Sequence, residues 1–594
     1  MDNEGFDADE QNNLFRGVVN RYLKWPLIMS RREWDDRNLT WQNVSDSLHE
    51  TGFDNGLYDI VVQRQTESSN SNIIFITEPI TLFPWNIAPN VKERYVSFIV
   101  TTAKAIIENN GGTVEIDILT QDVRDIVDFE KEMFNVRTDF KDNYISSNVS
   151  IPLTIQHFQE QYDKQHPENQ EKIDWYSTIK KVFASEGIAI EPSEKIIVNK
   201  ITYFAKLVSL LKRTPSRTIG NYMQWTIYLH KINDLIIYSK LNRITNKTKI
   251  MCKESNLDVA ICHEYVKKYL LPKTIHDIIQ IITDVKSAVQ NQIKHTTWMN
   301  EPTKGACIEK LAYIGHNIKS ELYTNTSEVD KYHEKMNVGT THIDTLLNLS
   351  TFKRRKMLSS LRTPSNETFS DFYTVDINLA LGKNAYYSKY LNKFVIPLAY
   401  LQSSIYSGNF PFLSYGPLGF TIAHEISHAF HTFDGSGKYS NVDVQSWPQK
   451  NFEEFIKIPE CFINHYNEYT FLESQHMNVS MNGNKTLKEN IADSAGIAAA
   501  YYAYRNRKAK LNETEWRLLG LEQYNDDQIF FIMYAQTMCE SFLPTELRHR
   551  TSDVHSANEI RVRGSLSNFP EFSAAYNCPV GTLMNPVKKC ALWY

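Results

Sequence analysis

Apolar residues recur with the period of a helix over most of the first 360 residues. Between about residues 90 and 345 they return every three or four positions, as in VSFIVTTAKAIIENN, NYMQWTIYLHKINDLIIYSKL and TIHDIIQIITDVKSAVQNQI. This spacing gives a helix one apolar face. An apolar, β-branched run ahead of them, IIFITEPITLF at 73–83, predicts a strand broken by Pro79.

The pattern changes after TPSNETFSD at 363–371. KFVIPLAYLQ at 393–402 predicts a strand, and RVRGSL at 561–566 predicts another ahead of a tail that carries Pro and Cys. Residues 417–433 and 486–508 have the spacing of helices. The later part of the chain therefore mixes helices with strands.

These patterns predict an α+β protein that is predominantly α-helical. We expect a helical N-terminal domain over residues 1–365 and an α+β domain over residues 366–594. The 594 residues are 42% hydrophobic and 22% charged, which are values of globular proteins rather than disordered ones.

Charge and hydropathy exclude two kinds of partner. The net charge is −5 and no block of Lys and Arg stands out, so we expect no nucleic-acid partner. No stretch approaches the roughly 18 uninterrupted apolar residues of a membrane helix, so we expect no membrane segment in this chain. The start MDNEGFDADEQNN is acidic, unlike a signal peptide.

Two other features favour an oxidising, extracellular compartment. The chain has more N-x-S/T glycosylation sequons than chance predicts for its composition. They begin at Asn38, Asn43, Asn148, Asn246, Asn325, Asn348, Asn366, Asn478, Asn484 and Asn512. The seven cysteines lack C-x-x-C spacing and three lie near the C-terminus, a pattern that suits disulfides better than a metal site.

The sharpest chemical signal is the pentad His424-Glu425-Ile426-Ser427-His428. Residues four apart share one face of a helix, so His424 and His428 can bind the same zinc ion, with Glu425 beside them as general base. The surrounding residues GPLGFTIA are apolar enough to be buried. Two histidines and a carboxylate are costly there unless something binds them.

A catalytic zinc site needs a third protein ligand. Asp434 is the candidate if the motif continued as HExxHxxGxxH, but His431 stands where that motif needs Gly. Glu489 in TLKENIADSAG is the preferred candidate, with Asp493 one turn later to accept the outer N–H of a zinc-binding histidine. The alternative is that Thr486 and Glu489 form a helix-capping box and nothing more.

Four motifs occur in order along the chain: HEISH, KENIADSAG, DVHSANEIR and the closing KKCALWY. Together they resemble the neprilysin family of zinc endopeptidases, which includes endothelin-converting enzyme. The resemblance is dense from about 378 to 594 and thinner upstream. It implies a helical N-terminal domain over a thermolysin-like catalytic domain. It also implies a single catalytic Zn²⁺ held by His424, His428 and Glu489, with Glu425 as general base and Asp493 as the supporting carboxylate.

The resemblance also implies how a substrate is held. Asn384 and Ala385, in KNAYYS, match a pair that hydrogen-bonds the substrate backbone. His555 resembles the histidine that stabilises the oxyanion, and Arg561 resembles the arginine that holds a substrate carbonyl. From the residues alone, His555 could instead be a core histidine paired with Asp553, and Arg561 a surface cation.

Family members usually begin with a cytoplasmic tail, a membrane helix and a Cys-bearing segment, which we expect this chain to lack as a shortened form. Cys461 and Cys590 match a family pair that can still form a disulfide. We therefore expect an extracellular or cell-surface zinc endopeptidase that cleaves small peptides on the amino side of hydrophobic residues. The alternative is a non-catalytic member that binds peptides or partners in the same cleft.

Overall fold

The computed structural model describes only part of the chain. The described residues are 25–29, 40–50, 53–64, 71–79, 90–109, 111–138, 152–165, 172–227, 258–318, 324–340, 342–363, 382, 384–388, 392–401, 405–407, 410–430, 438–439, 442–443, 449–470, 480–512, 517–541 and 553–593.

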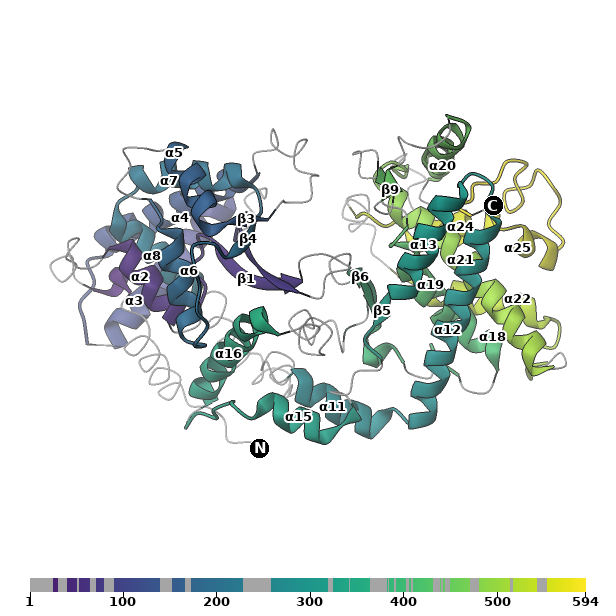
Figure 1. The fold of residues 1–594 in the computed structure, drawn as a ribbon, viewed down its shortest axis with the longest axis horizontal. Helices are drawn as coiled ribbons and strands as arrows, with labels where there is room; N and C mark the ends of the chain where they lie inside the picture. Colours follow the sequence, from purple (N-terminus) through teal and green to yellow (C-terminus); the bar gives the residue numbers. More distant parts are fainter. Residues whose placement is uncertain are drawn as a thin grey trace. The chain divides into compact units, whose positions relative to one another are not determined.

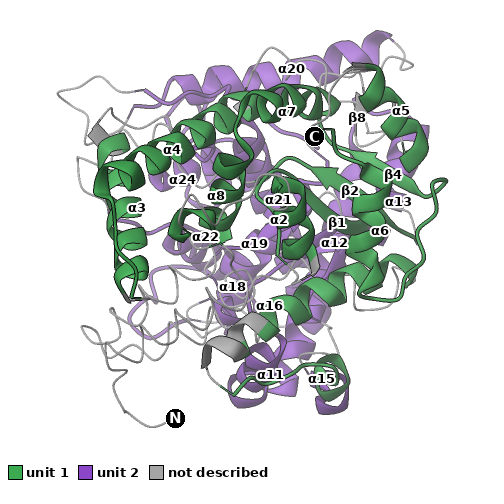
Figure 2. Ribbon diagram, turned by 90° about the vertical axis from the view of Figure 1, so that its left-hand side faces the viewer, with its two compact units in different colours: residues 1–258, 330–374 green, residues 259–329, 375–594 purple. Residues whose placement is uncertain are grey.

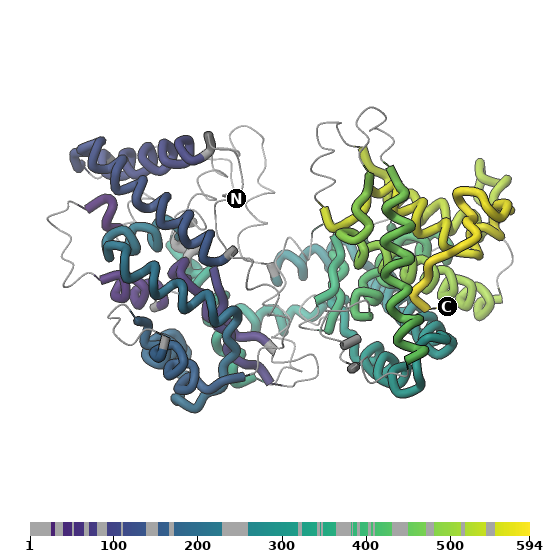
Figure 3. The backbone as a smooth tube through the Cα atoms, turned by 90° about the horizontal axis from the view of Figure 1, so that it is seen from above, coloured from purple at the N-terminus to yellow at the C-terminus, as the bar shows by residue number. Residues whose placement is uncertain are grey.

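The chain divides into two compact units (Figure 2). Unit 1 holds Met1–Asp258 and Asp330–Thr374, and unit 2 holds Val259–Val329 and Val375–Tyr594. These units do not coincide with a single division at 365/366, because residues 259–329 belong to unit 2; the order of the segments along the chain can be followed in Figure 3. The separate roles expected for the two domains stay a prediction.

Unit 1 is a helical body around one small sheet (Figure 1). Its helices are η1 (Pro26–Ile28), α2 (Trp41–Glu50), α3 (Asn90–Asn109), α4 (Ile116–Thr138), α5 (Ile155–Gln165), α6 (Trp175–Ala184), α7 (Ile201–Arg213), α8 (Ser216–Ile227), α16 (His342–Ser359) and η4 (Ser360–Arg362). Its strands are β1 (Asp59–Arg64), β2 (Asn72–Thr77), β3 (Leu153–Thr154) and β4 (Lys195–Val198).

The sheet of unit 1 has the order β1-β2-β4-β3. β2 pairs antiparallel with β1 and parallel with β4. Successive residues of β2 face opposite sides, so Ile74 and Ile76 enter the large core while Ile73 and Phe75 pack with Ile197 on the other face. This confirms the strand predicted from IIFITEPITLF over its first residues.

Unit 2 contains the segments that carry the motifs. Its helices are α11 (Asp258–Tyr269), α12 (Pro272–His295), α13 (Glu301–Tyr313), η5 (Leu398–Tyr400), α18 (Pro411–Ser414), the π-helix η6 (Tyr415–Gly419), α19 (Phe420–Ser427), α20 (Gln449–Asn467), α21 (Leu487–Leu511), α22 (Asp526–Thr537), α24 (Asn558–Ser567) and α25 (Pro570–Ala575); α15 (Thr326–His333) lies where the chain returns to unit 1. Its strands are β5 (Gly315–His316), β6 (Tyr386–Ser388), β7 (Lys393–Val395), β8 (Lys438–Tyr439) and β9 (Val442–Asp443).

The centre of unit 2 is the long helix α21, which packs against α12, α19 and α24 (Figure 1). Every residue of α19 is buried, and so is most of α21 from Asn490 to Tyr504. Gly496 lets the two helices approach closely. A Cβ atom on Gly496 would lie 3.0 Å from the backbone nitrogen and 3.1 Å from the Cα of His424.

Two strand predictions in unit 2 need correction. RVRGSL instead forms part of helix α24, whose buried residues are Ile560, Gly564, Ser565, Leu566 and Ser567. Four buried residues in succession do not alternate between two faces as they would in a half-buried strand. Gly564 faces the ring of Tyr466 so closely that a Cβ there would lie 2.5 Å from it. KFVIPLAYLQ forms a strand only over its first three residues, β7, and then turns into η5.

A disulfide closes unit 2. Cys461 on α20 is bonded to Cys590, 129 residues later, which confirms the expected pair. Among the described residues no helix combines the length and apolar character needed to cross a membrane.

Gly496→Ala should lower the stability of the protein by about 1–3 kcal/mol, since the added methyl group meets backbone atoms of α19 that cannot rotate away. The matched control is Gly305→Ala in α13, where a Cβ meets nothing within 4 Å. A helical Gly→Ala change with free space should stabilise by about 0.5–1 kcal/mol. Thermal unfolding of both variants checks this; a raised melting temperature for Gly496→Ala contradicts the close approach.

Candidate metal centre and active site

Helix α19 presents both histidines of the pentad on one face. His428 follows the last residue of α19, and its backbone N–H still bonds to the carbonyl of His424 at 3.2 Å. The helical spacing therefore holds through His428, and the two Nε2 atoms lie 3.1 Å apart. The strongest local prediction from the sequence thus has the expected geometry.

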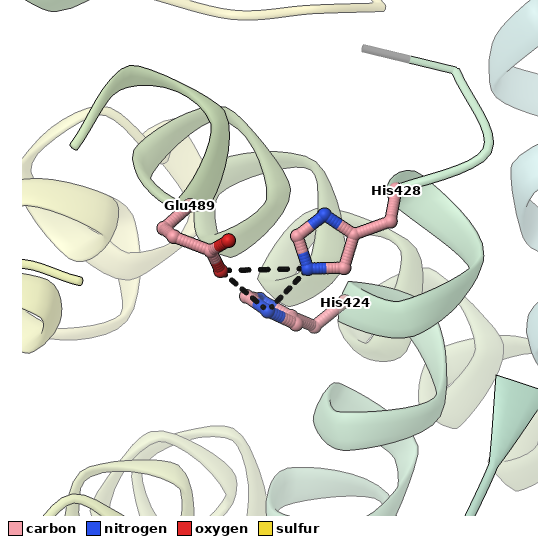
Figure 4. Close-up of side chains that lie close together, drawn as sticks. All are labelled: His424, His428 and Glu489. Carbon is pink, nitrogen blue, oxygen red and sulfur yellow. Dashed lines mark hydrogen bonds and ion pairs between the residues drawn. The ribbon is translucent and has the colours of Figure 1, made fainter. Parts of the chain in front are cut away.

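Glu489 reaches these histidines from the first turn of α21 (Figure 4). Its Oε2 lies 3.3 Å from Nε2 of His424 and 3.4 Å from Nε2 of His428. Among the described residues, these three form the single group arranged to hold a metal ion. Asp434, the rival candidate, lies outside the described residues.

The three donor atoms fit a zinc ion. Two ligand atoms at about 2.0–2.1 Å from a tetrahedral zinc lie about 3.3 Å apart, and the three separations here are 3.1, 3.3 and 3.4 Å. Two imidazole nitrogens and one carboxylate oxygen are also a donor set that zinc enzymes use. None of the described residues hydrogen-bonds to the buried Oε2 of Glu425, which lies next to this group in the sequence.

A buried ion pair supports the first histidine from behind. Oδ1 of Asp493, which is fully buried, lies 2.9 Å from Nδ1 of His424. A proton on Nδ1 that faces Asp493 leaves the lone pair of Nε2 directed at Glu489 and His428. Arg561 meets the same carboxylate with two hydrogen bonds, Nε to Oδ2 at 2.8 Å and Nη2 to Oδ1 at 2.7 Å. Arg561 is therefore not a surface cation.

Burial and charge set the proton affinities of the cluster in opposite directions. Burial lowers the pKa of His424, but Asp493 and Glu489 outweigh burial and raise it to about 10. Burial raises the pKa of Glu489, but the nearby rings of His424, His428 and His555 outweigh burial and hold this pKa far below its usual range. Glu425 differs because burial prevails there and raises its pKa, although His424 and His428 oppose the shift.

His555 is the third histidine around Glu489. Its Nε2 lies 3.3 Å from Oε2 of Glu489, while its Nδ1 lies 2.9 Å from Oδ1 of Asp553. The pairing with Asp553 is therefore real, but His555 is not a core histidine, since its side chain is 36% exposed. Hydrogen bonding to Glu489 raises its pKa above the usual value.

Asn384 and Ala385 lie directly before β6, which is one of the two edge strands of the sheet β5-β7-β6. Asn384 is exposed and Ala385 is buried. Strands β6 and β7 both contact α19, so the pair lies at the end of a strand that packs beside the helix of the two histidines.

The sequence interpretation missed a set of hydrogen-bonded polar side chains beside the site, namely Thr486, Asn490 and Ser556. Thr486 precedes α21 but makes no capping hydrogen bond, so the capping-box alternative is wrong. Its hydroxyl instead donates to the carbonyl of Asn482 and accepts from Asn490. Asn490 in turn accepts a hydrogen bond from Ser556. Nothing in the local hydrophobic pattern marks these residues.

The chain is similar in sequence to known zinc peptidases over nearly its whole length. Rabbit (Oryctolagus cuniculus) neprilysin is 26% identical over 603 residues, which cover 96% of this chain and 78% of neprilysin. Bovine (Bos taurus) endothelin-converting enzyme 1 is 27% identical over 595 residues, which cover 94% of this chain and 74% of that enzyme.

Solved structures share the fold at lower identity. The zinc metalloprotease Zmp1 of Mycobacterium tuberculosis, in complex with an inhibitor, has a TM-score of 0.69 at 17% identity, covering 98% of this chain and 87% of Zmp1. PepO from Lactobacillus rhamnosis has a TM-score of 0.66 at 18% identity, covering 99% of this chain and 95% of PepO.

Two family models, both described as peptidase family M13, match residues 1–320 and 384–592. Together they span both the helical first part and the segments that carry the cluster. The chain belongs to peptidase family M13 and is a zinc-dependent metalloendopeptidase.

Proposed function

We propose that the protein hydrolyses small peptides on the amino side of a hydrophobic residue, with Glu425 as general base. The observation that carries the proposal is the group of three facing donor atoms from His424, His428 and Glu489, with Glu425 on the same turn of α19. That the helical first part restricts substrates to small peptides belongs to the same proposal and rests on the resemblance to neprilysin.

In this proposal His424, His428 and Glu489 hold one zinc ion per chain. Zinc, when bound, polarises a carbonyl group and makes water a nucleophile at neutral pH. Asp493 keeps His424 in the tautomer that exposes Nε2, and Arg561 neutralises the charge of Asp493, which would otherwise be buried without a second partner.

Glu425 takes a proton from the attacking water and passes it to the leaving nitrogen. Its burial supports this role, since a carboxylate with a raised pKa binds a proton more readily near neutral pH. His555 donates a hydrogen bond from Nε2 to the oxygen that becomes negative as the scissile carbonyl is attacked. Asp553 supports it by holding the other ring nitrogen.

The substrate lies as an added strand along β6. Its backbone hydrogen-bonds to Asn384 and Ala385 at the start of that edge strand. Arg561 holds the carbonyl of the residue after the scissile bond. This is compatible with its pair to Asp493, because a guanidinium has five N–H donors and the two hydrogen bonds to Asp493 use two of them.

We also place the protein at the cell surface or outside the cell. A disulfide between Cys461 and Cys590 is typical of an oxidising compartment. Four sequon asparagines, Asn43, Asn325, Asn484 and Asn512, are exposed and so accessible to glycosylation.

Glu425→Gln should abolish cleavage of an internally quenched peptide that has Phe or Leu after the scissile bond. The amide cannot accept the proton, so kcat should fall by a factor of about 10² to 10⁴, while the zinc content stays at one per chain. Chelation should stop the wild-type enzyme, and added zinc should restore it.

The matched comparison is Glu489→Gln, which replaces a negatively charged zinc ligand with a neutral amide. This variant should have both lower zinc content and lower activity. A Glu425→Gln variant as active as the wild type contradicts the general-base role. Zinc bound at one per chain with no cleavage across a diverse peptide library favours the peptide-binding alternative.

His555→Ala should lower kcat by a factor of about 10² to 10³, since one donor to the developing oxyanion is lost. KM and zinc content should change little, because His555 acts on the transition state. His276→Ala, at a histidine that is 80% exposed, is the control. A rise in KM with kcat unchanged contradicts the oxyanion role.

A further inference from the structure

A chain of buried hydrogen bonds connects the loop of His555 to the helix of Glu489. The hydroxyl of Ser556 donates to Oδ1 of Asn490 at 2.8 Å, and Nδ2 of Asn490 donates to the hydroxyl of Thr486 at 2.8 Å. Thr486 then donates to the carbonyl of Asn482 at 3.1 Å. Ser556, Asn490 and Thr486 are 2%, 0% and 1% exposed.

Two members of this chain are next to residues of the site. Asn490 follows Glu489 on α21, and Ser556 follows His555 in the loop before α24. Asp553 also holds His555, through both its ring and its backbone N–H, at 2.9 Å each. Those contacts lie within the loop, so they orient the ring but do not fix the loop relative to α21. The hydrogen bond from Ser556 to Asn490 fixes the loop relative to α21.

A second contact between α21 and the segment that follows His555 lies further along the chain. Arg561 anchors α24 to α21 through Asp493, five residues after Ser556. The loop with His555 therefore has its own anchor, and that anchor is a pair of neutral side chains whose polar atoms are shielded from water. A buried hydrogen bond of this kind fixes a distance well, since neither partner can exchange it for water.

We infer that Ser556 and Asn490 are positioning residues for peptide hydrolysis. They hold the imidazole of His555 at a fixed place beside Glu489, and Thr486 holds the amide of Asn490 in the orientation that accepts from Ser556. This inference rests on the proposed role of His555. Displacement of a catalytic group by about 1 Å can cost about 10²-fold in rate.

The test is a double-mutant cycle of Ser556→Ala and His555→Ala, with kcat, KM and zinc content measured on the same quenched peptide. Ser556→Ala alone should lower kcat about 10- to 100-fold with KM and zinc unchanged. In the His555→Ala background it should have no further effect, because the ring that it positions is gone. An equal loss in both backgrounds, or a loss of zinc, overturns the inference.

Ser494→Ala is the matched control. Ser494 is a buried serine on α21, four residues after Asn490, and none of the described residues hydrogen-bonds to its hydroxyl. The control should leave kcat unchanged. Should Ser556→Ala fail to fold, Ser556→Cys keeps a side chain of similar shape with a weaker donor, and its kcat should lie between those of wild type and His555→Ala.

A crystal structure of Ser556→Ala gives a readout that does not depend on activity. The ring of His555 should leave its position 3.3 Å from Glu489 Oε2 or occupy more than one position. An unchanged ring overturns the positioning role. If the ring moves and the wild-type enzyme cleaves no peptide, the positioning role stands and the proposed function fails.

Discussion

The structure of the site depends on the close packing of α19 against α21. That contact brings a carboxylate of one helix within 3.3 and 3.4 Å of two imidazoles on the other. Gly496 permits this approach, since a Cβ atom there would meet the backbone of His424. A ligand set divided between two helices keeps its geometry only if the helices cannot slide, and tightly packed backbones resist sliding.

The same packing creates an electrostatic problem that the neighbouring residues solve. Asp493 is fully buried, and an ionised group is costly in such a place unless it is paired. Asp493 lies between His424 and Arg561, and His555 lies between Glu489 and Asp553. The residues that carry the proposed chemistry are therefore also the residues that balance each other's charge.

The sequence predicted the parts of the site that depend on local spacing. His424 and His428 follow from a helical repeat of four, and Glu489 with Asp493 from the same repeat on a second helix. The meeting of the two helices is a long-range contact with no periodic signal. The need for a third zinc ligand suggested it, and the resemblance to a known family supported it. Ser556 and Asn490 were missed because a polar pair 66 residues apart leaves no local pattern. RVRGSL was misjudged because small residues such as Gly564 and Ser565 can be buried on a helix without adding hydrophobicity.

The most direct test of the account is anomalous X-ray scattering from crystals of the zinc-loaded protein, measured on both sides of the zinc absorption edge. The account predicts one strong zinc peak per chain, about 2.0–2.1 Å from Nε2 of His424, from Nε2 of His428 and from a carboxylate oxygen of Glu489. A peak that lacks Glu489 as a ligand, or one that lies away from these three side chains, would contradict it.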